Sequence, residues 1–67
     1  MRDWLKKARK EAGLTCSQTA EQLGMSEIYY QFIESGRRQP KMYVETAVKL
    51  SKVLRLPIQS IIDYETR

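Results

Sequence analysis

Apolar residues recur at helical spacing in several short segments of the chain, and glycine or proline separates the segments. Leu5, Ala8 and Ala12 lie three or four residues apart, which predicts a helix from Asp3 to Ala12 with these residues on its inner face. Gly13 follows at a position suited to a left-handed helix end. Because alternating β-branched residues are nearly absent, strands are not expected.

A capping box begins the next segment, since the Thr15 side chain can accept from the Gln18 backbone N–H and Gln18 can reach back. Gly24 ends this helix, and Ser26 is a favourable N-cap for the helix that follows. Two short helices joined so tightly are typical of a helix-turn-helix. The pattern predicts helices at about residues 16–23 and 26–35, within a motif at about 15–35.

Two further helical segments complete the pattern. Ala47, Leu50 and Val53 form an apolar stripe in a helix predicted from Val44 to Leu54. Pro57 interrupts the chain, and a last short helical turn follows. A chain of 67 residues is expected to hold one domain. The prediction is an all-α fold of five short helices in a single domain, residues 1–67.

The segment at residues 26–35 carries more apolar side chains than one buried face can use. Met25, Tyr30 and Ile33 fit an inward stripe, with Tyr29 at its edge. The remaining side chains would point outwards and are candidates for contact with a partner. This outward set is Glu27, Ile28, Gln31 and Phe32.

Glu34 lies near the inward edge of the same helix, where a carboxylate needs a cation. Arg9 is the candidate, because it lies on the inner part of the first helix and arginine suits buried bidentate pairing. The alternative is that Glu34 caps nearby N–H groups or faces solvent.

Charge and composition limit the classes of function that the chain can have. The net charge is +4, which favours polyanionic partners. No apolar run reaches the ~18 residues that a membrane span requires, and the charged first residues do not resemble a secretory signal. The single cysteine, Cys16, fits a reducing compartment. Without histidine or a nucleophile–base pair, the sequence predicts neither a metal site, a cofactor nor an enzyme.

The order and spacing of these motifs resemble the Cro/lambda-repressor type of helix-turn-helix, the Xre family, over nearly the whole chain. The resemblance implies a compact five-helix fold that reads DNA with the third helix, usually as a homodimer. The chain departs from the family pattern at Cys16, where glutamine is frequent, and on the third helix, where polar or basic residues are usual. The motif residues are Arg9, Gly13, Leu14, Thr15, Ala20, Leu23, Gly24, Met25, Ser26, Tyr29, Tyr30, Ile33, Glu34, Gly36, Arg38 and Pro40.

In this arrangement the third helix would enter the major groove, and the second would cross the backbone. Gln31 would read adenine, Glu27 would accept from cytosine N4, and Ile28 and Phe32 would pack on thymine methyl groups. Basic residues after the helix and groups at the two helix N-termini would hold phosphates. The phosphate set is Thr15, Cys16, Ser26, Tyr29, Arg37, Arg38 and Lys41.

Simpler interpretations remain open for each group. Glu27 is also an ordinary first-turn acid, Ile28 and Phe32 suit a protein interface, and Arg37 and Arg38 fit a solvated loop. The sequence therefore predicts a cytoplasmic DNA-binding regulator, most simply a repressor on a palindromic operator. The alternative is an antitoxin-like or antirepressor-like module that turns the third helix towards a regulatory protein. A redox switch at Cys16 is a further alternative.

Apolar residues near the C-terminus predict self-association, because a domain this small has little other surface that could bury them. Some of them would pack on Trp4, and the rest would form a two-fold interface. No small-molecule ligand is indicated. The candidate dimer residues are Leu56, Ile58, Ile61, Ile62 and Tyr64.

Overall fold

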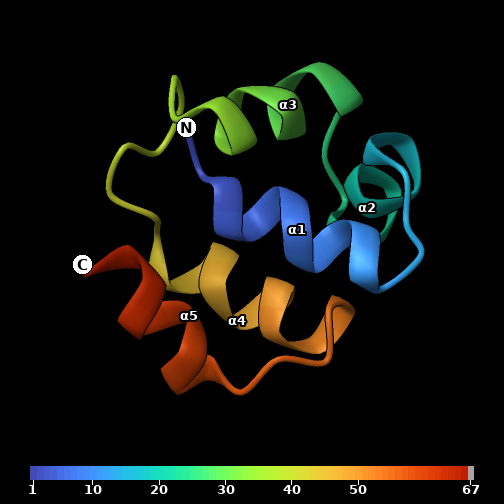
Figure 1. Ribbon diagram of the computed structural model, residues 1–67. Helices are drawn as coiled ribbons and strands as arrows, with labels where there is room; N and C mark the ends of the chain where they lie inside the picture. The colour runs from blue at the N-terminus through green and yellow to red at the C-terminus, as the bar shows by residue number, and fades with distance from the viewer. Residues whose placement is uncertain (67) are drawn as a thin grey trace.

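The computed structural model describes residues 1–66, and within this range the chain forms five α-helices and no strand (Figure 1). The predicted all-α fold is therefore confirmed, with the second and third helices forming the helix-turn-helix. The helices are α1 (Asp3–Glu11), α2 (Cys16–Leu23), α3 (Glu27–Ser35), α4 (Val44–Val53) and α5 (Ile58–Glu65). Helices α1 and α4 end one residue earlier than predicted, and α5 continues beyond the single turn expected from its apolar residues.

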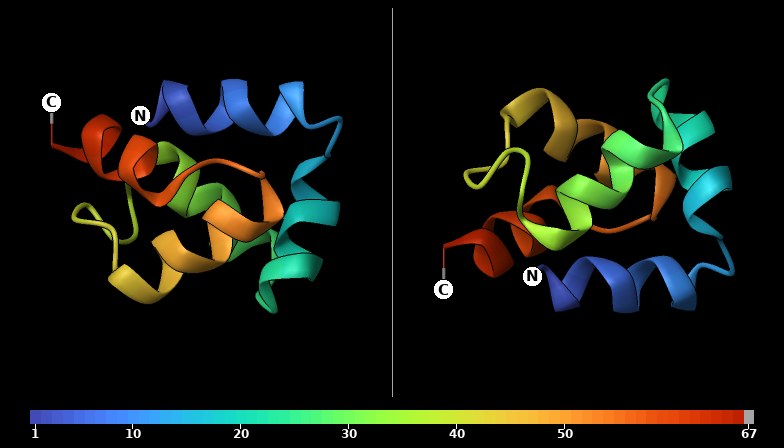
Figure 2. Two further views of the ribbon diagram at one scale, coloured as in Figure 1. Left: turned by 90° about the horizontal axis from the view of Figure 1, so that it is seen from below. Right: turned by 90° about the horizontal axis from the view of Figure 1, so that it is seen from above.

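In the view of Figure 1, helix α1 lies between α3 and α4, and both views of Figure 2 place it along one side of the domain. Helix α2 lies at the C-terminal end of α1, and α5 lies beside the start of α1 (Figure 2). The N-terminus is held at the end of α3, because the Arg2 backbone N–H donates to Glu34 O at 2.8 Å. None of the helices in residues 1–66 is long and apolar enough to span a membrane.

Every helix contributes to one apolar core. Full burial of a leucine or isoleucine side chain stabilises a fold by about 1.5–3 kcal/mol, so these few residues carry much of the stability. Ala12, predicted to face inwards, is exposed because α1 ends at Glu11 and Ala12 lies in the following turn. The buried apolar residues are Leu5, Ala20, Leu23, Tyr30, Ile33, Ala47, Leu50, Leu54 and Ile61.

Local capping signals fix the turn between α2 and α3. Gly24 has a φ of 73°, a left-handed conformation that glycine adopts without the steric cost of a Cβ. Ser26 is the N-cap of α3, and its Oγ accepts from the Tyr29 backbone N–H at 3.1 Å. The capping box that the sequence predicts is also present, since Thr15 and Gln18 exchange both hydrogen bonds. These bonds set the direction in which α3 leaves the turn.

Candidate nucleic-acid interface

Helix α3 presents three of its four predicted base-reading side chains to solvent. Glu27, Ile28 and Gln31 are exposed, and 65% of the Ile28 surface is accessible. The Gln31 amide Nε2 donates to Glu27 Oε2 at 3.3 Å across one helical turn. The outer face of α3 thus combines an apolar side chain with a carboxylate–amide pair.

Phe32 is half-buried rather than fully outward. The Arg37 guanidinium carbon lies 5.9 Å from the centre of its ring, within the range of a cation–π contact. Arg37 itself is exposed. Phe32 therefore supports a basic side chain at the end of α3 as well as lining the edge of its outer face.

The N-terminus of α2 holds two predicted phosphate contacts, which differ in exposure. Thr15 is exposed, but its Oγ1 already accepts from Gln18 N at 3.1 Å. The Cys16 thiol is free of any disulfide, and the residue is half-buried and packs against the core. The hydroxyl proton of Thr15 remains available for donation, since its oxygen is an acceptor in the capping box.

Tyr29 and Gln39 join α3 to the segment that follows it. Tyr29 is half-buried, and its hydroxyl accepts from Gln39 Nε2 at 3.2 Å. Gln39 is buried, has a φ of 50°, and accepts from the Tyr43 backbone N–H through Oε1 at 3.0 Å. Its side chain therefore bridges α3 and the start of α4, while its backbone adopts a conformation rare outside glycine.

Residues 36–43, here called the basic loop, connect α3 to α4. Arg37, Arg38 and Lys41 are exposed in this loop, close to the C-terminal end of α3. The predicted phosphate contact Ser26 is exposed at the opposite end of the same helix. The predicted contacts other than Thr15 and Cys16, which lie at the start of α2, are therefore distributed along α3 and at both of its ends.

The predicted ion pair between Arg9 and Glu34 is present. Arg9 Nε lies 2.7 Å from Glu34 Oε2, and Arg9 Nη1 also donates to Leu14 O at 2.9 Å. The hydrogen bond to Glu34 raises the pKa of Arg9 above its ordinary value, although burial acts in the opposite direction. In the nearby core, burial raises the pKa of Tyr30, and the Glu34 carboxylate adds to that effect. The pair fastens α1 to α3.

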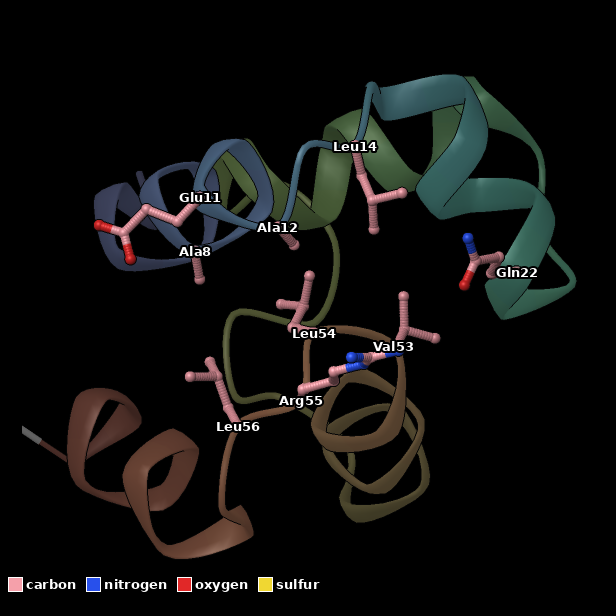
Figure 3. A pocket seen from close by; sticks show the side chains of 9 residues that line it. All are labelled: Ala8, Glu11, Ala12, Leu14, Gln22, Val53, Leu54, Arg55 and Leu56. Atoms are coloured by element: carbon pink, nitrogen blue, oxygen red, sulfur yellow. The ribbon is translucent and has the colours of Figure 1, made fainter.

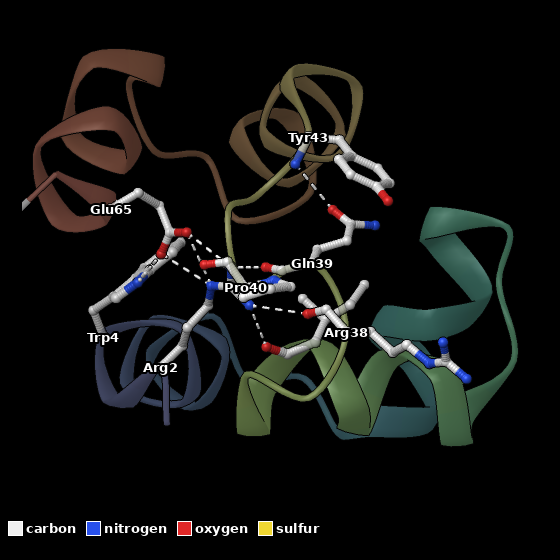
Figure 4. Close-up of polar contacts among 8 residues, drawn as sticks. Arg2, Trp4, Arg38, Gln39, Pro40, Tyr43 and Glu65 are labelled. Atoms are coloured by element: carbon white, nitrogen blue, oxygen red, sulfur yellow. Dashed lines mark hydrogen bonds and ion pairs between the residues drawn. The ribbon is translucent and has the colours of Figure 1, made fainter.

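Sequence reasoning missed a second, larger polar cluster around Arg2 (Figure 4). Arg2 is 7% exposed, and its Nη1 donates to Ile33 O at 2.6 Å, while Nη2 donates to Gln39 O. Its Nη2 also lies 2.9 Å from Glu65 Oε1. No sequence signal marked it, because Arg2 stands in a charged stretch typical of a solvated surface and its partners are 31 to 63 residues away.

The predicted dimer surface requires correction. Ile61 is fully buried in the core and cannot form an interface, because the turn of α5 directs it towards the other helices. Leu56 is half-buried and also packs against the core. Tyr64 stacks on Trp4 with ring centres 5.2 Å apart, as expected for some of these residues. Ile58 and Ile62 remain exposed.

Ile58 and Ile62 lie close to the start of α4. Together with Val44 they line a shallow apolar groove of about 210 Å³ between α4 and α5. The sequence did not identify Val44 as part of this surface, although 79% of it is exposed. An apolar face of this kind is typical of protein–protein contact.

A cavity of about 570 Å³ lies between α1, α2 and the end of α4 (Figure 3). Its lining is mainly aliphatic, with Glu11, Gln22 and Arg55 as the polar side chains. These three do not include a nucleophile next to a base. Within residues 1–66, histidine, cysteine and acidic side chains nowhere gather as three possible metal ligands.

An all-α domain in which a capped α2 and a glycine turn expose one face of α3 is a helix-turn-helix domain. The family profile described as helix-turn-helix, HTH_3, matches residues 5–61, and the chain belongs to this family. The resemblance to the Xre and lambda Cro type is confirmed.

A relative in Bacillus subtilis (strain 168) is described as an uncharacterized HTH-type transcriptional regulator, YqaF. It is 40% identical to this chain over 48 residues, which make up 72% of this chain. The match covers 63% of the relative, so the chain spans less than two thirds of that protein's length. No solved structure shows a significant match.

Proposed function

We propose that the protein is a transcriptional regulator that binds double-stranded DNA with α3 in the major groove. The observation that carries this proposal is the position of three exposed cations in the basic loop next to the exposed outer face of α3. Cations hold the phosphate backbone without reading sequence, whereas side chains in the groove read bases. The name of the Bacillus subtilis relative supports the same class of activity.

The base-reading set is Glu27, Ile28, Gln31 and Phe32, in the roles that the sequence predicts. Phe32 has a second role, because it supports Arg37 at the edge of the interface. The phosphate set remains Thr15, Cys16, Ser26, Tyr29, Arg37, Arg38 and Lys41. Most of these side chains are exposed, and the half-buried Tyr29 and Cys16 contribute at the edge.

We also propose that the active form is a homodimer that represses transcription from a palindromic operator. Ile58, Ile62 and Val44 would meet their copies across a two-fold axis, which covers the groove between α4 and α5. Two recognition helices would then reach successive major grooves about 34 Å apart. A cytoplasmic location in a prokaryotic or phage context accompanies this role.

Selection of bound sequences from random duplex DNA, followed by a salt titration of the selected site, tests the proposal. We expect an enriched palindrome and an affinity that falls steeply with salt, because bound cations release counterions from DNA. Scrambled duplex of equal length is the control. Failure to enrich any sequence, together with the absence of salt-dependent binding to duplex, would contradict DNA recognition.

A protein-interaction role is the second candidate, and the exposed Ile28 beside Glu27 favours it. An acidic side chain repels phosphate, and an exposed isoleucine suits an apolar interface. In that case binding would change little with salt, since apolar contacts are not screened. The same titration therefore separates the two functions.

A further inference from the structure

The Arg2 side chain connects three separate parts of the chain at one point. Its guanidinium donates to Ile33 O in the last turn of α3, to Gln39 O in the basic loop and to the Glu65 carboxylate of α5. Figure 4 shows Gln39 and Glu65 on either side of the Arg2 guanidinium. A planar guanidinium carries five N–H donors and can therefore bond to several acceptors at once. A lysine ammonium could not reproduce these contacts.

The partners of Arg2 are themselves held in place. Glu65 accepts from Trp4 Nε1 at 2.9 Å as well as from Arg2 Nε at 3.0 Å. Gln39 bonds to the Tyr29 hydroxyl and to the Tyr43 backbone while its own carbonyl accepts from Arg2. A continuous set of hydrogen bonds therefore runs from α5 through Arg2 and Gln39 to α3.

The exposed cations of the basic loop lie on either side of Gln39 in the sequence. Arg37 and Arg38 precede Gln39, and Lys41 follows it by two residues. Gln39 has a left-handed backbone conformation that its surroundings must maintain. The Arg38 backbone N–H donates to Phe32 O at 3.2 Å, which holds the start of the loop to α3. Beyond this bond and the caps of the flanking helices, the loop has no helical hydrogen bonds, so its path after Arg38 depends on the contacts of Arg2 and Gln39.

We propose that Arg2 is a positioning residue, which fixes the basic loop against α3 and α5 so that its cations meet phosphates in one geometry. This inference rests on the proposed DNA-binding function. Arg2 itself is almost inaccessible and does not contact the ligand. It acts by removing the entropic cost of ordering the loop when DNA binds.

Arg2→Met tests this proposal, with Arg55→Met as the matched control. Both variants lose one positive charge, but Arg55 is exposed on the link between α4 and α5. We measure affinity for the selected duplex, the dependence of affinity on salt, and amide hydrogen exchange at residues 37–41. Circular dichroism establishes that each variant is folded. Arg2→Lys tests whether charge alone restores binding.

We expect Arg2→Met to bind about 10-fold more weakly than Arg55→Met, because its loop must be ordered on binding. The loop amides of Arg2→Met should exchange faster than those of the unaltered protein. Arg2→Lys should not restore the slower exchange. The salt slope should stay the same, whereas loss of a direct phosphate contact would reduce it by about 0.9. Equal affinity and equal exchange in the two variants, or a reduced slope specific to Arg2→Met, would overturn the proposal.

Glu65→Gln provides an independent variant if Arg2→Met does not fold. It leaves Arg2 bonded to the backbone carbonyl groups but removes the carboxylate charge. We therefore expect faster exchange of the loop amides and about 3-fold weaker binding. Unchanged binding and loop exchange in Glu65→Gln would overturn the proposal. If the unaltered protein binds no DNA, the proposed function fails, whereas loop exchange still decides whether Arg2 positions the loop.

Discussion

Arg9 of α1 and Glu34 of α3 form a buried ion pair, in which about one tenth of each side chain is exposed. Their separation of 2.7 Å between Nε and Oε2 is that of a charge-assisted hydrogen bond. Arg9 and Glu34 are both buried, whereas Ile28 of α3 is exposed. The role of the pair is therefore to hold α3 in place rather than to contact a ligand.

Removal of one partner should destabilise the protein strongly. We expect Glu34→Gln to lower the free energy of unfolding by about 3 kcal/mol, because Arg9 is left as a buried charge without its counterion. Urea denaturation measures this change. The double variant Arg9→Met/Glu34→Leu should recover most of the loss, since neither charge remains buried. A double variant as unstable as the single one would contradict this explanation.

The helix-turn-helix and the Arg9–Glu34 pair could be predicted because their signals are local or periodic. Thr15, Gly24 and Ser26 mark helix ends through bonds to residues three positions away. Arg9 and Glu34 lie on predicted inward faces, so burial itself required that each charge have a partner.

The Arg2 cluster could not be predicted in this way. Its bonds join residues 31 to 63 positions apart, and they depend on where the chain ends of α1 and α5 meet. Ile61 was misplaced for a related reason. Three isoleucines within five positions leave several possible inward faces, and only the packing of α5 against the core selects one.

Stability should fall in acid through Glu65. Burial alone would raise its pKa, but the hydrogen bonds from Arg2 and Trp4 outweigh burial and hold the pKa below the ordinary value. Its stabilising contribution is thus complete above the unfolded-state pKa of about 4.3 and is lost as pH falls through the lower folded-state pKa. Thermal melting from pH 7 to pH 2.5 should show a smaller decrease for Glu65→Gln than for the unaltered protein. Parallel curves would exclude Glu65 as a source of acid sensitivity.

Arg55 offers a simple route to higher stability. It follows the C-cap of α4 with a φ of 55°, a conformation that disfavours side chains with a Cβ. Arg55→Gly should raise the free energy of unfolding by roughly 0.5–1 kcal/mol. This is the relief of the steric cost at the positive φ less the entropic cost of glycine, which gives the unfolded chain more conformational freedom. Arg55→Ala keeps the steric cost and should give no such gain. Equal stability of the glycine and alanine variants would show that the steric cost of the positive φ does not exceed the entropic cost of glycine.

Self-association should depend on the exposed part of the α4–α5 groove. Ile62→Glu places a charge on a side chain that is 44% exposed, so we expect a folded protein that no longer dimerises. Sedimentation velocity gives the oligomeric state, and binding to a half-site duplex separates dimerisation from recognition. Half-site affinity should be unchanged, whereas affinity for the palindrome should fall. Ile61→Glu, at the buried neighbour, should instead unfold the domain.

Ile28 gives the most direct test of sequence reading by α3, because it is the most exposed apolar side chain of that helix. Ile28→Ala should change stability by less than about 0.5 kcal/mol, as expected for an exposed position. It should reduce discrimination at one base pair of each half-site by about 1 kcal/mol, since a methyl contact with thymine is lost. Competition among duplexes with single base changes measures this effect. Arg38→Ala is the matched comparison, and it should weaken binding to all duplexes alike and lower the salt slope by about 0.9. If Ile28→Ala weakens all duplexes equally, Ile28 does not read sequence.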